Sequence, residues 1–396
     1  MSVPVTHRRE PESYLVRTTR WVGAIILALV LAAGFAGAAL AQQQQPKKGA
    51  PPAAKGTAPQ AKGAARAQGQ DVDFGSATEA EPAPIVPREA IEPREAMRAF
   101  VSEISAYARN LKRDFVVVTL GGLELLEKVD PVDPTKRAPS TAYMRTIDGV
   151  VAREIYFHPP RGGRDETRTD DRVRTELLRL ADFGQQRGVR VWTLDYAKDA
   201  AMADSAVKSA LAKKYVPFTA TNVDYRFNRL PPGRPVNENP HNISGLNHVQ
   251  NFLMLTDTAA WDTQEEFALA LAGTNYDAVV VDVYYRGRAP LSRRTVESLR
   301  YKKLGARRLV LAYMNIGEAE ADRFYWKPGW REGSPYFIGS PTPGNPDKYI
   351  VQYWQPGWRE IITGNANSYL YGIVAQGFDG VVLDGIEAFH DQEGDR

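Results

Sequence analysis

Five acidic residues stand at or just after the ends of apolar runs in the chain: Glu154, Asp195, Asp282, Glu318 and Asp384. If those runs are parallel strands of a barrel, their carboxyl ends meet at one mouth and the acids share one cleft. A carboxyl pair can cleave a glycosidic bond, because one group protonates the leaving oxygen while the other attacks the sugar or activates water. Taken singly, each acid could instead cap a helix. Together they favour an acidic cleft, which suits a cationic ligand.

The segments that must position these acids alternate between short β-rich apolar runs and amphipathic stretches. Runs that are apolar on both faces and separated by helices indicate a parallel sheet covered by helices. The predicted strands cover 115–119, 149–152, 189–194, 216–219, 251–255, 278–281, 309–313 and 380–383, and the predicted helices cover 93–111, 171–187, 201–213, 262–272, 294–304 and 358–376.

Eight strands predict an α/β fold, a (β/α)8 TIM barrel, with two doubly wound domains as the alternative. The order has one irregularity, since helix 93–111 precedes the first strand and no helix is predicted after 380–383. If the last strand pairs with the first, helix 93–111 supplies the missing helix. The sequence therefore predicts that strand 380–383 lies beside strand 115–119.

The first 90 residues differ from the rest in composition. Residues 1–41 join a basic start to an apolar run, 21–41, that ends in Ala-Leu-Ala, which predicts a signal peptide or an uncleaved membrane anchor. Residues 42–90 are rich in Gln, Pro, Ala, Lys and Gly and predict a disordered tether. We expect residues 91–396 to form one domain that is secreted or periplasmic, with membrane contact only if the leader stays uncleaved.

Charge and cysteine content exclude several classes of protein. Of the 50 Lys+Arg and 47 Asp+Glu, residues 1–90 hold 10 and 7, which leaves 40 of each in the domain and gives no sign of a nucleic-acid partner. The chain has no cysteine, so it has neither disulfides nor thiol chemistry. Its histidines show no metal-ligand spacing and it has no dinucleotide or P-loop motif, so we expect neither metal nor cofactor.

Residues 245–396 resemble the first half of a known family of barrels. The matching stretches are "YDAVVVDVY", "LVLAYMNIGEAEADRFYW", "YIVQYWQPGWREII" and "GFDGVVLDGIEAF". The family is the endo-α-1,4-polygalactosaminidases, the glycoside hydrolase 114-like TIM barrels. The resemblance implies a polysaccharide hydrolase whose substrate contains galactosamine.

Residues 93–235 resemble the second half of the same family. The resemblance is carried by "ISAYARNLKRDFVVVTLGGLELLE", "IDGVVAREIYF", "GVRVWTLDYA" and "VPFTATNVDYRFNRLP". The chain thus looks like a circular permutant, with family strands five to eight in 91–240 and strands one to four in 241–396. The Pro- and Asn-rich stretch between the halves would join the family's usual end to its usual start.

The resemblance implies roles for two of the acids. The family's catalytic pair falls on Asp384 in "GVVLDG" and Glu154 in "DGVVAREIYF". If the mechanism is retaining, Asp384 is the nucleophile and Glu154 the general acid/base. These residues lie on strands far apart in the chain but two apart in a closed barrel.

Other residues of the predicted mouth are candidates for substrate binding. Aromatic rings would stack on sugar faces, and the remaining acids would bind a substrate cation or tune the catalytic pair. The candidates are Asp195, Tyr196, Asp282, Tyr313, Glu318, Glu320, Tyr353, Trp354 and Glu387. Two positions depart from the family: Leu120-Gly121 stands where a Gln-Asn pair is usual, and Glu387 replaces an Asp.

These features predict an exported glycoside hydrolase that cleaves an α-linked, galactosamine-containing exopolysaccharide through a carboxylate pair. The alternative is a barrel that binds cationic polysaccharide with weak or no cleavage, suggested by the loss of two amides at Leu120-Gly121. We expect a monomer, and a domain-swapped dimer with its hinge near 231–245 is a further possibility.

Overall fold

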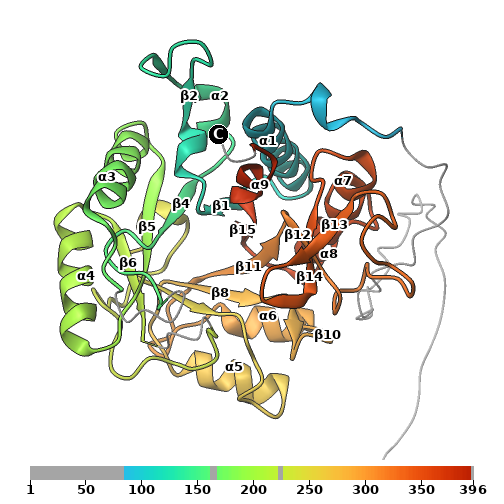
Figure 1. Ribbon diagram of the computed structural model, residues 1–396. Coiled ribbons are helices and arrows are strands. Elements are labelled where there is room, and N and C mark those ends of the chain that lie inside the picture. Colours follow the sequence, from blue (N-terminus) through green and yellow to red (C-terminus); the bar gives the residue numbers. More distant parts are fainter. Residues whose placement is uncertain (1–83, 161–166, 222–225, 394–396) are drawn as a thin grey trace, which may run out of the picture. The chain divides into compact units, whose positions relative to one another are not determined.

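The computed structural model describes residues 84–160, 167–221 and 226–393 (Figure 1). The predicted leader and nearly all of the predicted tether lie outside these residues. Within the described part, no helix has the length and apolar character needed to cross a membrane.

Eight parallel strands form a nearly closed barrel, which confirms the predicted fold class (Figure 1). Their order is β6-β5-β4-β1-β15-β11-β8-β7. At the two ends of this order, Phe218 packs on Phe252 with ring centroids 5.6 Å apart. The strands are β1 (Val116–Leu120), β4 (Gly149–Arg153), β5 (Arg190–Tyr196), β6 (Val216–Ala220), β7 (Phe252–Leu255), β8 (Ala278–Asp282), β11 (Leu309–Asn315) and β15 (Gly380–Asp384).

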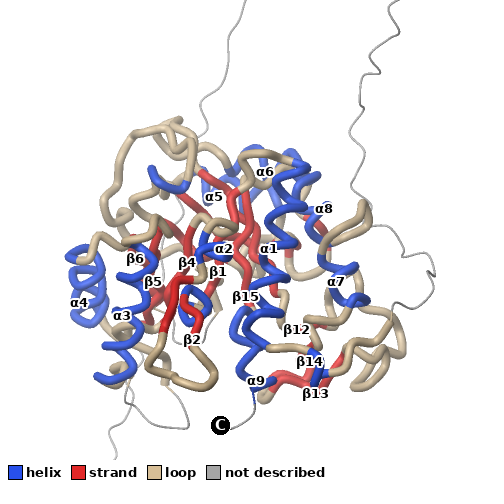
Figure 2. The backbone as a smooth tube through the Cα atoms, turned by 90° about the horizontal axis from the view of Figure 1, so that it is seen from above, coloured by secondary structure: helices blue, strands red, loops and turns tan. Residues whose placement is uncertain are grey.

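The last strand lies beside the first, as the sequence predicts. β15 runs parallel to β1, with Val117 opposite Val381 and Val118 opposite Val382. The helix α1 (Pro93–Leu111) packs against helices that follow β14 and β15, so it covers the β15 side of the barrel (Figure 2). The order of strands around a barrel does not depend on which strand begins the chain, so the exchange of halves stays a prediction.

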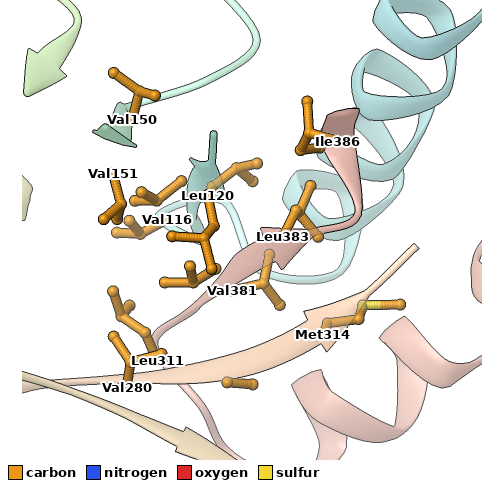
Figure 3. Packing of buried hydrophobic residues seen from close by; sticks show 14 of the residues in the cluster. Val116, Leu120, Val150, Val151, Val280, Leu311, Met314, Val381, Leu383 and Ile386 are labelled. Carbon is orange, nitrogen blue, oxygen red and sulfur yellow. The ribbon is translucent and has the colours of Figure 1, made fainter. Parts of the chain in front are cut away.

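The barrel core is made of aliphatic side chains from neighbouring strands. Figure 3 shows Val116 and Leu120 of β1 gathered with Val151 of β4, Leu311 of β11 and Val381 of β15. All are buried. Burial of one such side chain stabilises the fold by roughly 1.5–3 kcal/mol, so apolar packing adds to the backbone pairing that joins β1 to β15.

Gly380 allows β15 to approach β1 closely. A Cβ at Gly380 would overlap the carbonyl oxygen and the side chain of Val116. We expect Gly380→Ala to lower the free energy of unfolding by about 1–3 kcal/mol, since the added methyl must push the two strands apart. Urea unfolding measures this loss. Gly245→Ala is the matched control, because a Cβ there meets nothing within 4 Å; an equal loss in both variants would contradict the close-approach argument.

The helices agree with most of the predicted segments. α1 has the predicted bounds, and the segment predicted as one helix at 358–376 is two, because Thr363 is extended, Gly364 has a φ of 90° and Ser368 caps the second helix. The remaining helices are α2 (Thr141–Met144), α3 (Asp171–Gln185), α4 (Ala200–Ala212), α5 (Gln264–Ala272), α6 (Arg293–Leu299), α7 (Pro356–Ile362), α8 (Tyr369–Gln376) and α9 (Phe389–Glu393).

The expectation that no helix follows strand 380–383 is wrong. A 3-10 turn, η4 (Ile386–Ala388), and the short helix α9 come directly after β15. α9 also packs against α1, where Arg94 Nε donates to Glu393 Oε1 at 2.7 Å. Both α1 and α9 therefore lie next to the last strand.

In the described residues, three small antiparallel sheets that the sequence did not predict accompany the barrel. One of them brings side chains to the barrel mouth, and its strand order is β12-β14-β13. The strands of the three sheets are β12 (Glu318–Glu320), β13 (Ile338–Thr342) and β14 (Asn345–Val351), β2 (Glu127–Val129) and β3 (Arg137–Pro139), and β9 (Tyr284–Tyr285) and β10 (Ala289–Pro290). Three further 3-10 turns are η1 (Arg88–Ala90), η2 (Leu123–Leu126) and η3 (Leu246–His248).

The segment between the two halves is tied to the barrel by a buried ion pair. The side chains of Lys302 and Asp277 are fully buried and their charged groups are in contact. Lys302 Nζ also donates to the carbonyl oxygen of His241 at 3.0 Å. Asn239 Nδ2 and the Gln250 N–H donate to Asp277 Oδ2 at 3.0 and 2.8 Å. Both charges are thus compensated by the connecting segment and by each other.

His390 of α9 makes the stability of this end of the chain depend on pH. Its Nε2 lies 3.5 Å from Glu124 Oε1 and its Nδ1 lies 3.7 Å from Glu393 Oε2. The hydrogen bond with Glu124 raises the pKa of His390 above its ordinary value of 6.5, although burial and Arg94 oppose the rise. Stability from these contacts is therefore full below about pH 6.5 and is lost as the pH rises through the folded-state pKa.

We expect His390→Gln to lower the melting temperature at pH 5.5 and to leave it nearly unchanged at pH 8.5. The effect should be small, since the imidazole is about half exposed and solvent screens its charge. Thermal unfolding of the parent and the variant at both pH values measures it. A loss of equal size at both pH values would show that His390 contributes by packing on Phe389 rather than by charge.

Candidate active site

The strand ends place most of the predicted acids at one end of the barrel. Asp282 and Asp384 are the last residues of β8 and β15, Glu154 follows β4, and Asp195 is the next-to-last residue of β5. Glu318 opens β12, three residues after the end of β11. The carboxyl ends of parallel strands thus determine where the acids lie, as the sequence analysis expects.

A cavity of about 320 Å³ opens at this end of the barrel. It holds five of the predicted site residues, together with three cationic and several apolar side chains. The lining residues are Leu120, Arg153, Leu194, Tyr196, Phe227, Met254, Thr256, Asp282, Tyr313, Glu320, Arg323, Lys348 and Asp384.

Asp384 is surrounded by hydrogen-bond donors. The Tyr313 hydroxyl donates to its Oδ2 at 2.6 Å, and the Gly385 N–H donates to its Oδ1 at 2.8 Å. The Arg153 guanidinium lies 3.5 Å from the same Oδ1. Donors on both oxygens fix the orientation of the group and suit a carboxylate.

Tyr313 and Arg153 keep their protons in this setting. Burial, together with the neighbouring Asp384 charge, raises the pKa of Tyr313 well above its ordinary value. Burial alone would lower the pKa of Arg153, but the carboxylates of Asp384 and Glu387 raise it above its ordinary value. Asp384 therefore faces a neutral hydroxyl and a permanent cation.

Asp282 and Glu320 are held in a buried ion-pair chain. Arg323 donates to both oxygens of Asp282, from Nη1 at 2.9 Å and from Nη2 at 3.0 Å. Its Nε donates to Glu320, whose other oxygen lies 2.7 Å from Lys348 Nζ. The guanidinium and the ammonium thus link the ends of β8 and β12 to the middle of β14.

The pKa values of Asp282 and Glu320 are shifted by two opposed causes, burial and the neighbouring cations. Burial raises the pKa of Asp282, and the Arg323 charge counters that rise. For Glu320 burial acts in the same direction, but Arg323 and Lys348 together lower its pKa below the ordinary value. Glu320 is therefore an internal carboxylate compensated by two cations.

Glu318 lies at the edge of the same network. Asn315 Nδ2 donates to its Oε2 at 2.8 Å, the Thr342 hydroxyl donates to its Oε1 at 2.7 Å, and Lys348 Nζ lies 3.8 Å from Oε2. Glu318 and Glu320 are the two acids predicted as ligands for a substrate cation. Both lie within 4 Å of Lys348, a cation of the protein itself.

The expectation of an acidic cleft needs correction. Three carboxylates line the cavity, and so do the three cations Arg153, Arg323 and Lys348. Each of those carboxylates is in contact with at least one of the cations. The charge of the described lining is therefore balanced, because cations that the sequence analysis did not consider fold in beside the acids.

Glu154 lines a second cavity, of about 520 Å³, that shares Arg153 with the first. Its backbone is left-handed, with a φ of 57°, which is uncommon for a residue other than glycine. The conformation is held by the Glu154 N–H, which donates to the Leu194 carbonyl at 2.8 Å, and by the Thr169 hydroxyl, which donates to the Glu154 carbonyl at 2.7 Å. Strain of this kind is often found at functional sites.

Asp195 holds the loop that follows Glu154. Its Oδ1 accepts the backbone N–H groups of Tyr156 and Phe157 at 2.7 and 3.0 Å. Burial raises the pKa of Asp195 to about 7, and the nearby Glu154 charge adds to the rise. Asp195 is thus a positioning group, while its neighbour Tyr196 lines the first cavity.

Glu387 joins the loop after β15 to the loop after β1. Its carboxylate accepts the Gly122 N–H at 3.2 Å and pairs with Arg153. A Cβ at Gly121 would overlap this carboxylate, and the φ of 83° at Gly121 also favours glycine. The Glu387 carboxylate thus lies close against the backbone at Gly121, where a larger residue would not fit.

Two predicted aromatic residues lie outside both cavities. The Tyr353 side chain is fully buried and its hydroxyl donates to the Pro93 carbonyl at 2.8 Å. Trp354 Nε1 donates to the Val86 carbonyl at 3.1 Å. Both rings pack between the helical layer and the segment that leads into α1, because aromatic side chains bury large apolar areas.

The sequence analysis did not identify Arg153, Arg323 and Lys348 as site residues. Arg323 lies in the motif "IGEAEADRFYW", three residues after Glu320, and Arg153 directly precedes Glu154, so both lie close in sequence to predicted site residues. No comparable signal marks Lys348. Among the described residues, no group of three or more acidic or histidine side chains is arranged to hold a metal ion.

Comparison with known proteins finds a family match for the C-terminal part of the chain. Residues 252–396, from the start of β7, match the model of glycoside-hydrolase family GH114. Two relatives are an uncharacterized protein of Thermotoga maritima, 31% identical over 141 residues, and the uncharacterized protein MJ1477 of Methanocaldococcus jannaschii, 36% identical over 154 residues. These matches cover 36% and 38% of this chain and 42% and 41% of the relatives, so the chain spans less than half of their length.

Proposed function

Because the chain is GH114-like over residues 252–396, we propose that it is a glycoside hydrolase that cleaves an α-linked, galactosamine-containing polysaccharide. Asp384 and Glu154 form the proposed carboxylate pair. The observation that carries the proposal is the setting of Asp384, a carboxylate at a strand tip with a cavity before it and fixed donors on both oxygens.

The proposed reaction has two steps and retains the configuration of the sugar. The Asp384 carboxylate attacks the anomeric carbon while the glycosidic C–O bond breaks and Glu154, as the acid, gives its proton to the leaving oxygen. Glu154 then takes a proton from water, whose oxygen displaces Asp384 from the sugar. The Tyr313 hydroxyl orients Asp384 through a hydrogen bond. When Asp384 attacks, this hydroxyl can turn toward the charge that develops in the reaction.

The pairing of β1 with both β15 and β4 supports this choice of acids. Asp384 and Glu154 follow strands that are separated by β1 alone. Arg153 is shared by the cavity of Asp384 and the cavity of Glu154. A polysaccharide that occupies both cavities would pass this guanidinium, which can donate to sugar oxygens.

Release of reducing ends from a partly N-acetylated, α-1,4-linked galactosamine polymer tests the proposal. The parent protein is expected to release ends, and Glu154→Gln is expected to release them at least about a hundredfold more slowly, the usual range for loss of a general acid. Glu265→Gln is the matched control, since it makes the same substitution at an exposed residue of α5 and should leave the rate unchanged. Equal rates in the parent and Glu154→Gln would remove Glu154 from the mechanism.

A second candidate function is polysaccharide binding without cleavage. Arg153 favours this second function. Its guanidinium is in contact with Asp384 and also lines the cavity of Glu154, so it lies in the region where the two acids would have to act on one bond. Binding of the polymer that persists in the parent and in every acid variant, with no ends released, would support this candidate over the enzyme.

The leader, the tether and the exchange of halves complete the proposal. We propose that residues 1–41 direct the chain out of the cytoplasm, as a cleaved signal or an anchor, and that 42–90 tether the barrel. We also propose that β7, where the family match begins, is the family's first strand and that the chain is a circular permutant. Mass spectrometry of the N-terminus in the exported protein tests cleavage after the Ala-Leu-Ala at 39–41.

A further inference from the structure

Lys348 lies beside Glu318 and Glu320, the two acids that the sequence predicts as ligands for a substrate cation. Its Nζ lies 2.7 Å from Glu320 Oε1 and 3.8 Å from Glu318 Oε2. A free amino sugar would need these carboxylates as partners, and the chain has already supplied a cation to them. Glu320 raises the pKa of Lys348 above its ordinary value although burial lowers it, so the ammonium persists at neutral pH.

The other carboxylates of the cavity are also occupied. Asp282 receives two hydrogen bonds from Arg323, and Asp384 has Arg153 at 3.5 Å. A substrate ammonium group that entered this cavity would lose its hydration. Each carboxylate of the described lining already has a cationic partner, so the ammonium would gain no new one. Burying a charge without such compensation costs several kcal/mol.

The wall of the cavity includes an apolar surface. Leu120, Leu194 and Met254 are buried, and Phe227 lies beside them and near Tyr196, with ring centroids 6.3 Å apart. A lining that combines these apolar side chains with charge-balanced polar groups suits a neutral group that has both a methyl and an amide.

We propose that Lys348 is a specificity-determining residue that makes this site accept an N-acetylated hexosamine unit and reject the unit with a free amine. This inference rests on the proposed function, whose galactosamine polymer contains the amine in one form or the other. The acetamide carries no charge, its methyl can pack on the apolar surface, and its carbonyl can accept from a cationic donor. The sequence analysis expected the opposite preference.

The test compares two α-1,4-linked galactosamine oligosaccharides, one with free amines and one fully N-acetylated, at a pH where the amines are protonated. The preference is the ratio of kcat/KM values, or the ratio of Kd values where the parent cleaves neither. We expect the parent to prefer the acetylated form, and Lys348→Met to shift the ratio toward the free amine by about tenfold or more, since an ammonium can then bind Glu320.

Two variants serve as controls. Lys348→Arg keeps the cation and should keep the parent's preference, and Lys208→Met removes an exposed lysine of α4 and should change nothing. A parent that prefers the free amine, or a Lys348→Met ratio equal to the parent's, would overturn the inference and leave the proposed hydrolase intact. Absence of cleavage with a clear acetyl preference in binding would overturn only the hydrolase, and absence of both cleavage and binding would overturn both.

Discussion

Asp384→Asn is expected to abolish glycosidic cleavage, with kcat reduced about a thousandfold or more. The amide cannot act as a nucleophile, and a group that forms the covalent intermediate has no substitute in the same position. The fold should persist, because the Asn oxygen can still accept from Tyr313 or from the Gly385 N–H. Release of reducing ends, with the melting temperature measured beside it, checks both expectations.

The matched control for this change is Asp204→Asn, which makes the same substitution at an exposed site on α4. It should leave kcat unchanged. If Asp384→Asn kept more than a tenth of the parent's rate, Asp384 would not be the nucleophile. The hydrogen bond between Tyr313 and Asp384 would then have only a structural role, linking β11 to the end of β15.

Lys302→Met is expected to lower the free energy of unfolding by about 3–5 kcal/mol. The change leaves the Asp277 carboxylate fully buried without its cation, and an uncompensated buried charge is strongly destabilising. It also removes the donor to the His241 carbonyl, so the segment between the halves loses an anchor. Denaturant unfolding followed by tryptophan fluorescence measures the loss.

Lys303→Met is the control, since Lys303 is the next residue and its side chain is exposed. It should change the free energy of unfolding by less than about 0.5 kcal/mol. A similar small value for Lys302→Met would mean that the pair contributes little and that packing holds the connecting segment. In that case Asp277→Asn should also be tolerated.

The barrel was predictable because its strands are decided by local pattern. β1, β8 and β15 are runs of Val and Leu that are buried on both faces, and such runs are recognisable without knowledge of their neighbours. Even the pairing of β15 with β1 followed from an unpaired helix at the start. The sheet of β12, β13 and β14 was not predictable, because strands such as "IGSPT" and "NPDKYIV" have no alternation of their own and are held by antiparallel pairing.

The site was predictable only in part, for a related reason. The acids follow strands, so their place in a barrel is determined by sequence position. Their partners are not: Lys348 reaches Glu320 only because β14 pairs with β12. Tyr353 and Trp354 were predicted at the mouth but lie elsewhere. An aromatic residue near a strand can face a cavity or pack on α1 and the segment before it, and the sequence does not distinguish the two.

The central claim is that two acids from distant parts of the chain form one catalytic unit. The most direct test measures reducing-end release in parallel in the parent, Asp384→Asn, Glu154→Gln and the double variant. The account predicts that each single variant loses most of the activity and that the double variant is hardly slower than Asp384→Asn, because residues that act in one mechanism are not additive. A Glu154→Gln variant as active as the parent, or losses that simply multiply in the double variant, would contradict it.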